Sequence, residues 1–387
     1  MNRVEDLSFD YTKASPVSFM EYMIKVMKRI RISDVEKSLV EKFLKARKKA
    51  RIKRRLSDDG VVKLKAYIIP HDIEVESKYG IPIKIKIANN SGLKIINGRR
   101  LGLFMRLGPL GGYLLGEWKC RTFLAYTEID YEIRGRIKVR ARPIMVPLNS
   151  CECIEDPRID PDDAKVMYHV RGYYIIWPSK LTEMLENQME IILTFKTVLS
   201  EENDVLKIEP LMFMDRNGDV FLLRHYRDSF PLTSKYMTIR PILLELGTGG
   251  VFVAPRQDNV VPFDELEPVP DLLPQEREKK VGGNVSVKIS SNEYLLIYHA
   301  VEEYFGGYYT YAALFSEDGE YLGSTVEPII PVSPDMYPGC RPTTIFVCGV
   351  VKVGDELIIS AGKDDEIIVL YECEVDDIVE RMRFVKG

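Results

Sequence analysis

The hydrophobic pattern of the chain changes once, near residue 60. Within residues 16–56, apolar side chains recur three and four positions apart, which predicts amphipathic helices. From residue 61 onward the chain carries short runs rich in Ile, Val and Tyr, and isoleucine occupies every second position of residues 81–87. A period of two predicts strands. The pattern therefore predicts a helical N-terminal arm, residues 1–60, followed by an all-β domain, residues 61–387.

The predicted strands come in sets of three or four that recur roughly every 45–60 residues, an arrangement typical of a β-propeller. Glycine and Asp/Asn turns separate them, as in residues 215–219. A two-sheet sandwich is the structural alternative. We prefer the propeller because acidic and aromatic strand ends recur along the whole chain, and a radial array brings the inner strand of each blade to one central channel.

Composition narrows the class of protein. The net charge of −4 over 387 residues gives no general basic field, so we expect no binding to nucleic acid. The N-terminus has no apolar signal core, and the chain has no run of about 18 apolar residues that could span a membrane. The six cysteines are scattered, as expected for reduced thiols. These features predict a soluble, cytoplasmic protein without a membrane partner.

Two local features have competing interpretations. Cys151 and Cys153 are one residue apart, too close for the usual zinc site, so we expect no metal. Residues 45–55 are strongly basic and could bind a polyanion or an acidic partner. A solvated helix end is favoured, because no aromatic residues interleave with the basic ones. A homo-oligomer that forms through the N-terminal helices is a further hypothesis.

Residues 154–160 place three acids and one guanidinium between two predicted strands. Pro157 fixes its own φ and biases Asp156 toward an extended backbone. Such a turn would present Asp156 and Arg158 rigidly, as positioning a proton donor requires. The alternative is a solvated surface turn that holds a local Asp/Arg pair. The second half of the chain helps to choose between them.

Several segments resemble, in the same order, motifs of the β-mannoside phosphorylase family, glycoside hydrolase family 130. They include Glu155-Asp156-Pro157-Arg158, which corresponds to the family's EDPR, and the Tyr298-His299-Ala300-Val301 strand end. The similar segments are residues 155–158, 282–315, 327–330, 346–349 and 362–370. The resemblance covers roughly residues 95–380 and leaves the helical arm outside, and the ordered set is more specific than any single motif.

The resemblance implies a five-bladed β-propeller with a sugar pocket on its axis. It implies an inverting phosphorylase that cleaves β-mannosyl oligosaccharides with inorganic phosphate to give α-mannose 1-phosphate, and that needs no other cofactor. Asp156 would be the general acid, passing its proton through a mannose hydroxyl. The chemistry is coherent, because cleavage needs an acid on the leaving oxygen and a nucleophile on the opposite face. Phosphate can be that nucleophile if a cationic cradle holds it.

The resemblance also suggests the binding residues. The candidates for sugar contact are Arg106, Arg158, Lys288, Tyr298 and Asp365. Arg158 would orient either the carboxylate of Asp156 or a sugar hydroxyl. The candidates for phosphate contact are His299, Arg227, His225 and Lys207. Lys207 is one residue out of register with the family lysine, and either His225 or Arg227 could fill a single role. One arginine of the family has no clear counterpart in this sequence, and Lys196 and Arg171 are the two candidates to replace it.

Two other functions stay open. An inverting hydrolase on the same scaffold could use Glu302 or Glu303, beside His299, as a general base that activates water. A sugar-binding propeller without catalysis is the third hypothesis.

Overall fold

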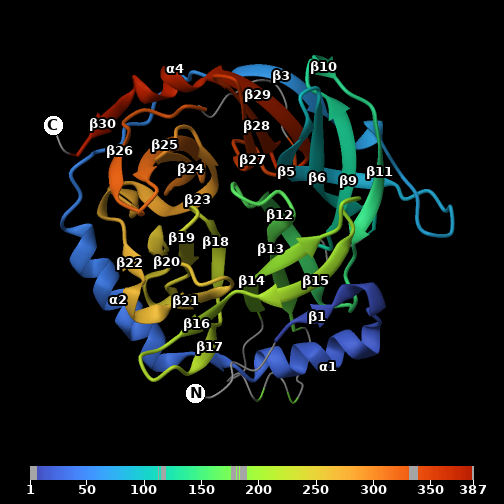
Figure 1. Ribbon diagram of the computed structural model, residues 1–387, viewed down its shortest axis with the longest axis horizontal. Helices are drawn as coiled ribbons and strands as arrows, with labels where there is room; N and C mark the ends of the chain where they lie inside the picture. The colour runs from blue at the N-terminus through green and yellow to red at the C-terminus, as the bar shows by residue number, and fades with distance from the viewer. Residues whose placement is uncertain are drawn as a thin grey trace.

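The computed structural model of the protein describes residues 7–111, 113–114, 119–175, 180, 183, 190–330 and 339–385. Five sheets of four or five strands surround a central axis, which confirms the predicted five-bladed β-propeller (Figure 1). Two N-terminal helices lie outside the ring. None of the helices in the described ranges is long and apolar enough to cross a membrane.

Each blade contributes one inner strand to the axis. From blade I to blade V the inner strands are β5 (Ile85–Asn97), β12 (Glu152–Ile159), β18 (Tyr226–Pro231), β23 (Glu278–Lys288) and β27 (Ile345–Val353). Blade I continues outward with β6 (Arg100–Pro109), β9 (Phe123–Asp130), β11 (Val139–Met145) and β4 (Ile73–Val75). Blade II continues with β13 (Val166–Tyr174), β14 (Glu190–Leu199), β15 (Val205–Pro210) and β1 (Phe9–Asp10).

The other three blades follow the same plan. Blade III adds β19 (Tyr236–Pro241), β20 (Phe252–Pro255) and β22 (Glu267–Pro268). Blade IV adds β24 (Glu293–Glu302), β25 (Tyr308–Ser316), β26 (Tyr321–Thr325) and β30 (Met382–Phe384). Blade V adds β28 (Glu356–Lys363), β29 (Ile367–Glu374), β3 (Lys63–Ile68) and β10 (Gly135–Arg136), and the short helix α4 (Val375–Val379) follows β29. Two small sheets lie outside the blades: β2 (Ile30–Arg31), β17 (Val220–Leu223), β16 (Met212–Met214) and β21 (Val260–Pro262), and the pair β7 (Tyr113–Leu114) and β8 (Lys119–Cys120).

Strand β3 closes the ring. It comes from the start of the β region, yet it pairs antiparallel with β29 of the last blade, with Tyr67 opposite Val369. The last blade therefore contains strands from both ends of the chain, which is how a propeller avoids leaving its first and last blades unpaired.

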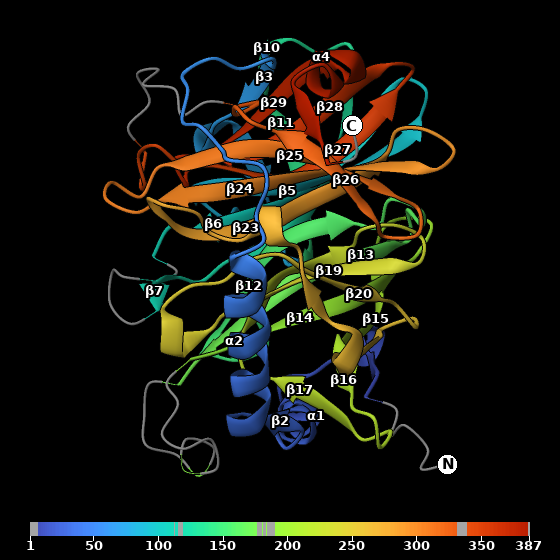
Figure 2. The same cartoon turned by 90° about the vertical axis from the view of Figure 1, so that its left-hand side faces the viewer.

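The two helices pack on the propeller rather than standing apart from it. Helix α1 (Pro16–Met27) buries Phe19 and helix α2 (Ser33–Arg47) buries Phe43, both in one hydrophobic cluster with blades II and III. Figure 2 shows α2 lying along the side of the molecule. After α2, the buried Arg54 forms an ion pair with Glu278 of blade IV at 2.6 Å. The arm is thus tied to blades II, III and IV.

Every inner strand is interrupted by a β-bulge where it passes the axis. The pairing register shifts between Asn89 and Gly92, Glu155 and Arg158, Arg227 and Phe230, Gly283 and Val285, and Val347 and Gly349. In the first three bulges a left-handed backbone occurs at Asn90, Asp156 and Asp228, with φ of 45°, 54° and 48°. Asn and Asp tolerate this conformation better than most residues. A bulge re-aims a side chain, so these strands direct polar groups toward the axis.

The bulge in β12 corrects two expectations for residues 154–160. They are not a turn between strands, because residues 152–159 form a strand that pairs with β13. Asp156 is left-handed instead of extended, because the ladder skips Asp156 and Pro157. The regular pairs on both sides of the bulge hold Asp156 in place, so the strand provides the rigidity that we expected from a turn.

Candidate active site

A cavity of about 520 Å³ opens on the axis and takes residues from all five blades. Its volume lies in the range of small-molecule sites. Its charged lining residues are Lys86, Arg106, Glu155, Asp156, Arg227, Asp228, Arg240, Lys280, Arg341 and Asp365. Six of them are cations and four are acids, so this part of the cavity has more positive than negative groups.

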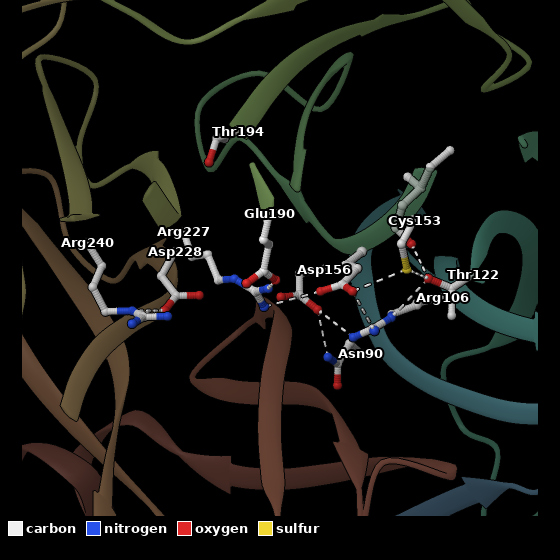
Figure 3. A network of polar contacts seen from close by, with 12 residues as sticks. Asn90, Arg106, Thr122, Cys153, Asp156, Glu190, Thr194, Arg227, Asp228 and Arg240 are labelled. Carbon is white, nitrogen blue, oxygen red and sulfur yellow. Dashed lines mark hydrogen bonds and ion pairs between the residues drawn. The ribbon is translucent and has the colours of Figure 1, made fainter. Parts of the chain in front are cut away.

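Asp156 lines the cavity and is only 4% exposed. Its Oδ1 accepts one hydrogen bond from Asn90 Nδ2 at 2.7 Å and one from Arg106 Nη1 at 3.2 Å (Figure 3). Both donors belong to blade I, whereas Asp156 belongs to blade II. The position of the carboxylate is therefore fixed from the neighbouring blade.

Glu155 connects two guanidiniums on either side of Asp156. Its Oε1 lies 3.1 Å from Arg106 Nη2 and its Oε2 lies 3.3 Å from Arg227 Nη1. Burial alone would lower the pKa of Arg106, but the carboxylates of Glu155 and Asp156 raise this pKa above its ordinary value. Arg106 Nε also donates to Thr122 Oγ1 at 3.3 Å. The sequence-predicted Arg106, Asp156 and Arg227 are thus brought together.

Asp228 forms a second ionic group at the other end of the row of side chains in Figure 3. Arg158 Nη2 donates to it at 2.9 Å and Arg240 Nε at 2.5 Å. Burial opposes ionisation, but these two guanidiniums hold the pKa of Asp228 well below its ordinary value. Asp228 is therefore a carboxylate whose charge is already neutralised by protein groups.

Arg158 does not line the cavity, so the predicted contact with a sugar is wrong. The side chain is 1% exposed. Its guanidinium donates to Asp228, to the backbone oxygen of Asp156 at 3.1 Å and to that of Asn284 at 2.5 Å. These bonds occupy the donor groups and join β12, β18 and β23. Arg158 positions Asp156 from behind.

Two cations meet over one tyrosine ring. The Nζ of Lys280 lies 5.1 Å from the centre of the Tyr308 ring, and the Cζ of Arg341 lies 4.8 Å from it. Neither Lys280 nor Arg341 forms an ion pair with another residue that the structure describes. Desolvation, with Arg240 nearby, lowers the pKa of Lys280 well below its ordinary value. The pair is suited to an anion, which would restore the charge of the lysine.

Uncharged groups at the cavity also lack partners. The side-chain oxygens of Asn89, Asn90 and Thr344 are buried without a hydrogen bond to any described residue. Burying such atoms costs free energy unless a partner arrives, and sugar hydroxyls could serve. Asp365 lies in the same lining, and burial raises its pKa above the ordinary value despite the cations Arg106 and Arg341.

The two predicted histidines lie outside the lining. His299 is fully buried, and its Nδ1 is 2.8 Å from Asn284 Oδ1. Burial lowers the pKa of His299 well below its ordinary value, so it is neutral at physiological pH. His225 Nε2 lies 2.5 Å from the backbone oxygen of Glu190. Of the two residues considered for one role, only Arg227 reaches the cavity.

Three other predicted binding residues are not part of the cavity lining, so their predicted contacts are wrong. Lys288 is eight residues beyond Lys280 on β23, about 26 Å along the strand. Tyr298 is buried between blade IV and the arm, with its ring 5.7 Å from Arg54 Cζ. Lys207 pairs with Glu209 at 3.2 Å on β15, in the outer part of blade II. The resemblance to the family placed these three residues on strands of the propeller, but it did not show which side chains on those strands reach the cavity.

The residues considered as replacements for the family arginine, and those considered as a general base, also lie outside the cavity lining. Arg171 is buried in an ion pair with Glu152, and Lys196 pairs with Glu209 at 3.5 Å. Glu302 accepts a hydrogen bond from the backbone N–H of Tyr304 at 2.8 Å, at the end of β24. None of these three side chains, nor Glu303, is part of the described lining.

Arg240, Lys280 and Arg341 lie outside every segment that resembled the family. Lys280 lies two residues before the segment that begins at Gly282 and resembles the family. This position was the only feature of the sequence that could have indicated that Lys280 reaches the cavity. No group of three His, Cys, Asp or Glu side chains that could hold a metal ion occurs among the described residues. The cavity is lined by carboxylates, guanidiniums, amines and neutral hydrogen-bonding groups.

Solved structures share this fold. The β-1,2-mannobiose phosphorylase of Listeria innocua, in complex with β-1,2-mannobiose, is 16% identical with a TM-score of 0.59, and the match covers 85% of this chain and 98% of that one. A second similar structure comes from work on the GH130 family of mannoside phosphorylases, which reports that the family contains glycoside hydrolases that target β-1,2 mannosidic linkages in Candida mannan. It is 14% identical with a TM-score of 0.55, over 84% of this chain and 97% of that one.

A third similar structure is a glycosyl hydrolase from Bacteroides ovatus, 14% identical with a TM-score of 0.52, over 84% of this chain and 94% of that one. No curated protein matches the sequence. A family model described as β-1,4-mannooligosaccharide phosphorylase matches residues 52–384. The matched region contains all five inner strands and every residue of the axial cavity. The chain therefore belongs to glycoside hydrolase family 130 and has the features of an enzyme that acts on mannosides.

Proposed function

We propose that the protein is an inverting β-mannoside phosphorylase, which cleaves β-mannosyl oligosaccharides with inorganic phosphate and releases α-mannose 1-phosphate. The observation that supports it best is the Lys280–Arg341 pair over Tyr308. Neither side chain forms an ion pair with a described residue, and both share a cavity with Asp156. A phosphate nucleophile needs cations that hold it in place, and this pair is available because neither side chain is in an ion pair. A hydrolase, which uses water, needs no such pair.

In the proposed reaction, Asp156 supplies the proton that the leaving oxygen gains, directly or through a sugar hydroxyl. The bond between the anomeric carbon and that oxygen breaks while a phosphate oxygen attacks the opposite face. The proton of hydrogen phosphate returns to Asp156, so the enzyme is regenerated. Asn90 and Arg106 hold the carboxylate at its reacting position, and Arg240, Lys280 and Arg341 receive the phosphate.

One observation favours inverting hydrolysis as the second candidate. Asp365 lines the same cavity, and burial raises its pKa, which would help it to accept a proton from water. Glu155 and Asp228 are poorer bases, because each is already bound by two guanidiniums. Asp365 is therefore the residue to test if phosphate proves unnecessary.

The deciding experiment incubates the protein with β-1,2- and β-1,4-linked mannobiose, with and without phosphate, and measures mannose 1-phosphate and free mannose. We expect mannose 1-phosphate only when phosphate is present. Equal release of free mannose in both conditions would make the enzyme a hydrolase. Binding of a mannoside without turnover under any condition would make it a sugar-binding propeller.

A further inference from the structure

A second cavity, of about 850 Å³, adjoins the axial one. Lys86 lines both cavities. Glu366 of the second cavity directly follows Asp365 of the first. Cys340 of the axial cavity also has its Sγ 3.5 Å from Glu366 Oε2. The two spaces therefore share a wall between blades I and V, and a substrate larger than one sugar could extend from one into the other.

The lining of the second cavity combines an aliphatic part with charged residues. The aliphatic side chains are Ile69, Ile73, Val75, Ile83, Ile85 and Leu110, and the charged ones are Glu74, Glu76, Lys84, Lys86 and Glu366. Apart from the imidazole of His71, its described lining contains no aromatic ring. A sugar carries hydroxyls around its ring, and burying them against aliphatic side chains costs free energy. The aliphatic part of the lining therefore fits an alkyl group better than another sugar.

Backbone hydrogen bonds hold this wall in place. Ile83 N donates to Val75 O at 2.8 Å, so the segment after β4 folds back on that strand. Leu110 N donates to Lys84 O at 2.8 Å, which brings the end of β6 beside it. Leu110 remains 63% exposed although it lines the cavity. An apolar surface is thus formed before any ligand binds, which lowers the entropy cost of binding.

The second cavity also lies on the side from which a leaving group would depart. An inverting displacement places the nucleophile and the leaving group on opposite faces of the sugar. Arg240 belongs to blade III and Lys280 to blade IV. The guanidinium of Arg341, from the segment before β27, lies over the Tyr308 ring of blade IV. Blades III and IV are the two that are not neighbours of blade I in a ring of five. Lys86 belongs to the inner strand of blade I. The group expelled by phosphate would therefore leave toward Lys86.

We propose that the second cavity binds an apolar leaving group, so that the preferred substrates include β-mannosides of long-chain alcohols. This inference rests on the proposed function, because it assigns the leaving side of the same reaction. Ile83 and Leu110 would determine this preference through contact with the alkyl chain.

The test compares methyl, butyl, hexyl and octyl β-mannosides, below their micelle concentrations, with mannobiose, mannotriose and mannotetraose. The measured quantity is kcat/KM for mannose 1-phosphate release. We expect kcat/KM to rise about two- to fourfold for each CH₂ that enters the cavity. Ile83→Gln and Leu110→Gln should reduce the octyl-to-methyl ratio. Leu206→Gln, a control on exposed apolar surface of blade II, should keep the wild-type ratio.

Binding to Asp156→Asn, measured by calorimetry without phosphate, provides a readout that does not depend on turnover. A flat response to alkyl length with a rise along the mannose oligomers would overturn the inference and make the cavity a sugar subsite. An alkyl preference that survives both glutamine variants would overturn the assigned location. If even methyl β-mannoside is neither bound nor turned over, the proposed function itself fails, which is distinct from the first two results.

Discussion

Asn90 and Asp156 meet across the boundary of blades I and II through a 2.7 Å hydrogen bond, and both occupy the left-handed position of a bulged inner strand. The donor is an amide, so it supports the carboxylate of Asp156 without adding charge. Two strained residues on adjacent strands thus stabilise one reacting group. Backbone strain of this kind is usually found where a precise side-chain position matters.

Replacing Asp156 by Asn should remove the proton donor and keep the shape of the cavity. We expect kcat to fall by about 10²- to 10⁴-fold, the usual contribution of a general acid, while mannoside binding by calorimetry persists. Asp59→Asn, which changes an exposed acid of the arm, is the control and should keep full activity. Unchanged turnover of Asp156→Asn would show that another group supplies the proton.

Phosphate binding should be accompanied by proton uptake at Lys280. Because desolvation lowers the pKa of this amine, it loses its proton at a lower pH than an ordinary lysine, and a bound anion raises the pKa again. Calorimetry in two buffers with different ionisation enthalpies, at a pH where phosphate is the dianion, measures the uptake directly. Phosphate affinity should fall as the pH rises. Lys280→Met should abolish the uptake and Lys279→Met, its exposed neighbour, should not.

Replacing Arg158 by Met should destabilise the fold more than it changes sugar contacts. The guanidinium joins β12, β18 and β23, and removing one partner of a buried ion pair costs about 3–5 kcal/mol. Denaturant unfolding measures the loss. Lys235→Met breaks an exposed ion pair with Asp318 and should cost about 0–1 kcal/mol. Equal losses in the two variants would contradict a structural role for Arg158.

Stability should fall in acid partly because of Asp228. Its folded-state pKa lies below the ordinary value of 3.8, since Arg240 and Arg158 outweigh burial. The unfolded chain therefore binds a proton first as the pH falls, so the stabilisation is present above about pH 4 and is lost below it. In Asp228→Asn the free energy of unfolding should depend less on pH in this range. Asp318→Asn, an exposed acid, should keep the wild-type dependence.

The sequence pattern predicted the strands in the outer parts of the blades, but it did not predict the structure of the strands at the axis. Runs such as residues 294–299 and 367–371 are continuous apolar strands in the sequence and in the structure. Strand β12 carries acids and an arginine that face its neighbours around the axis, so it lacks the alternation of a half-buried strand and resembles a turn. The pairing of β3 with β29 left no local pattern at all.

The candidate site was predictable only where a motif reached the axis. Arg106, Asp156, Arg227 and Asp365 line one cavity, which is where the resemblance placed them, although their roles stay predictions. Lys288 belongs to the same motif but is not part of the cavity lining, because it lies eight residues beyond Lys280 along β23. The cations of the proposed phosphate site come from blades III to V and are brought together only by the closed ring.

The pairing of β3 with β29 has a consequence for synthesis of the chain. Tyr67 leaves the ribosome about 300 residues before its partner Val369, so the final blade must wait until nearly all of the protein has been made. Contacts so distant in sequence are slow to form, and during that interval β3 presents an open edge. Lys63 and Lys65 on this strand would discourage its association with other nascent chains, since edge lysines oppose strand addition.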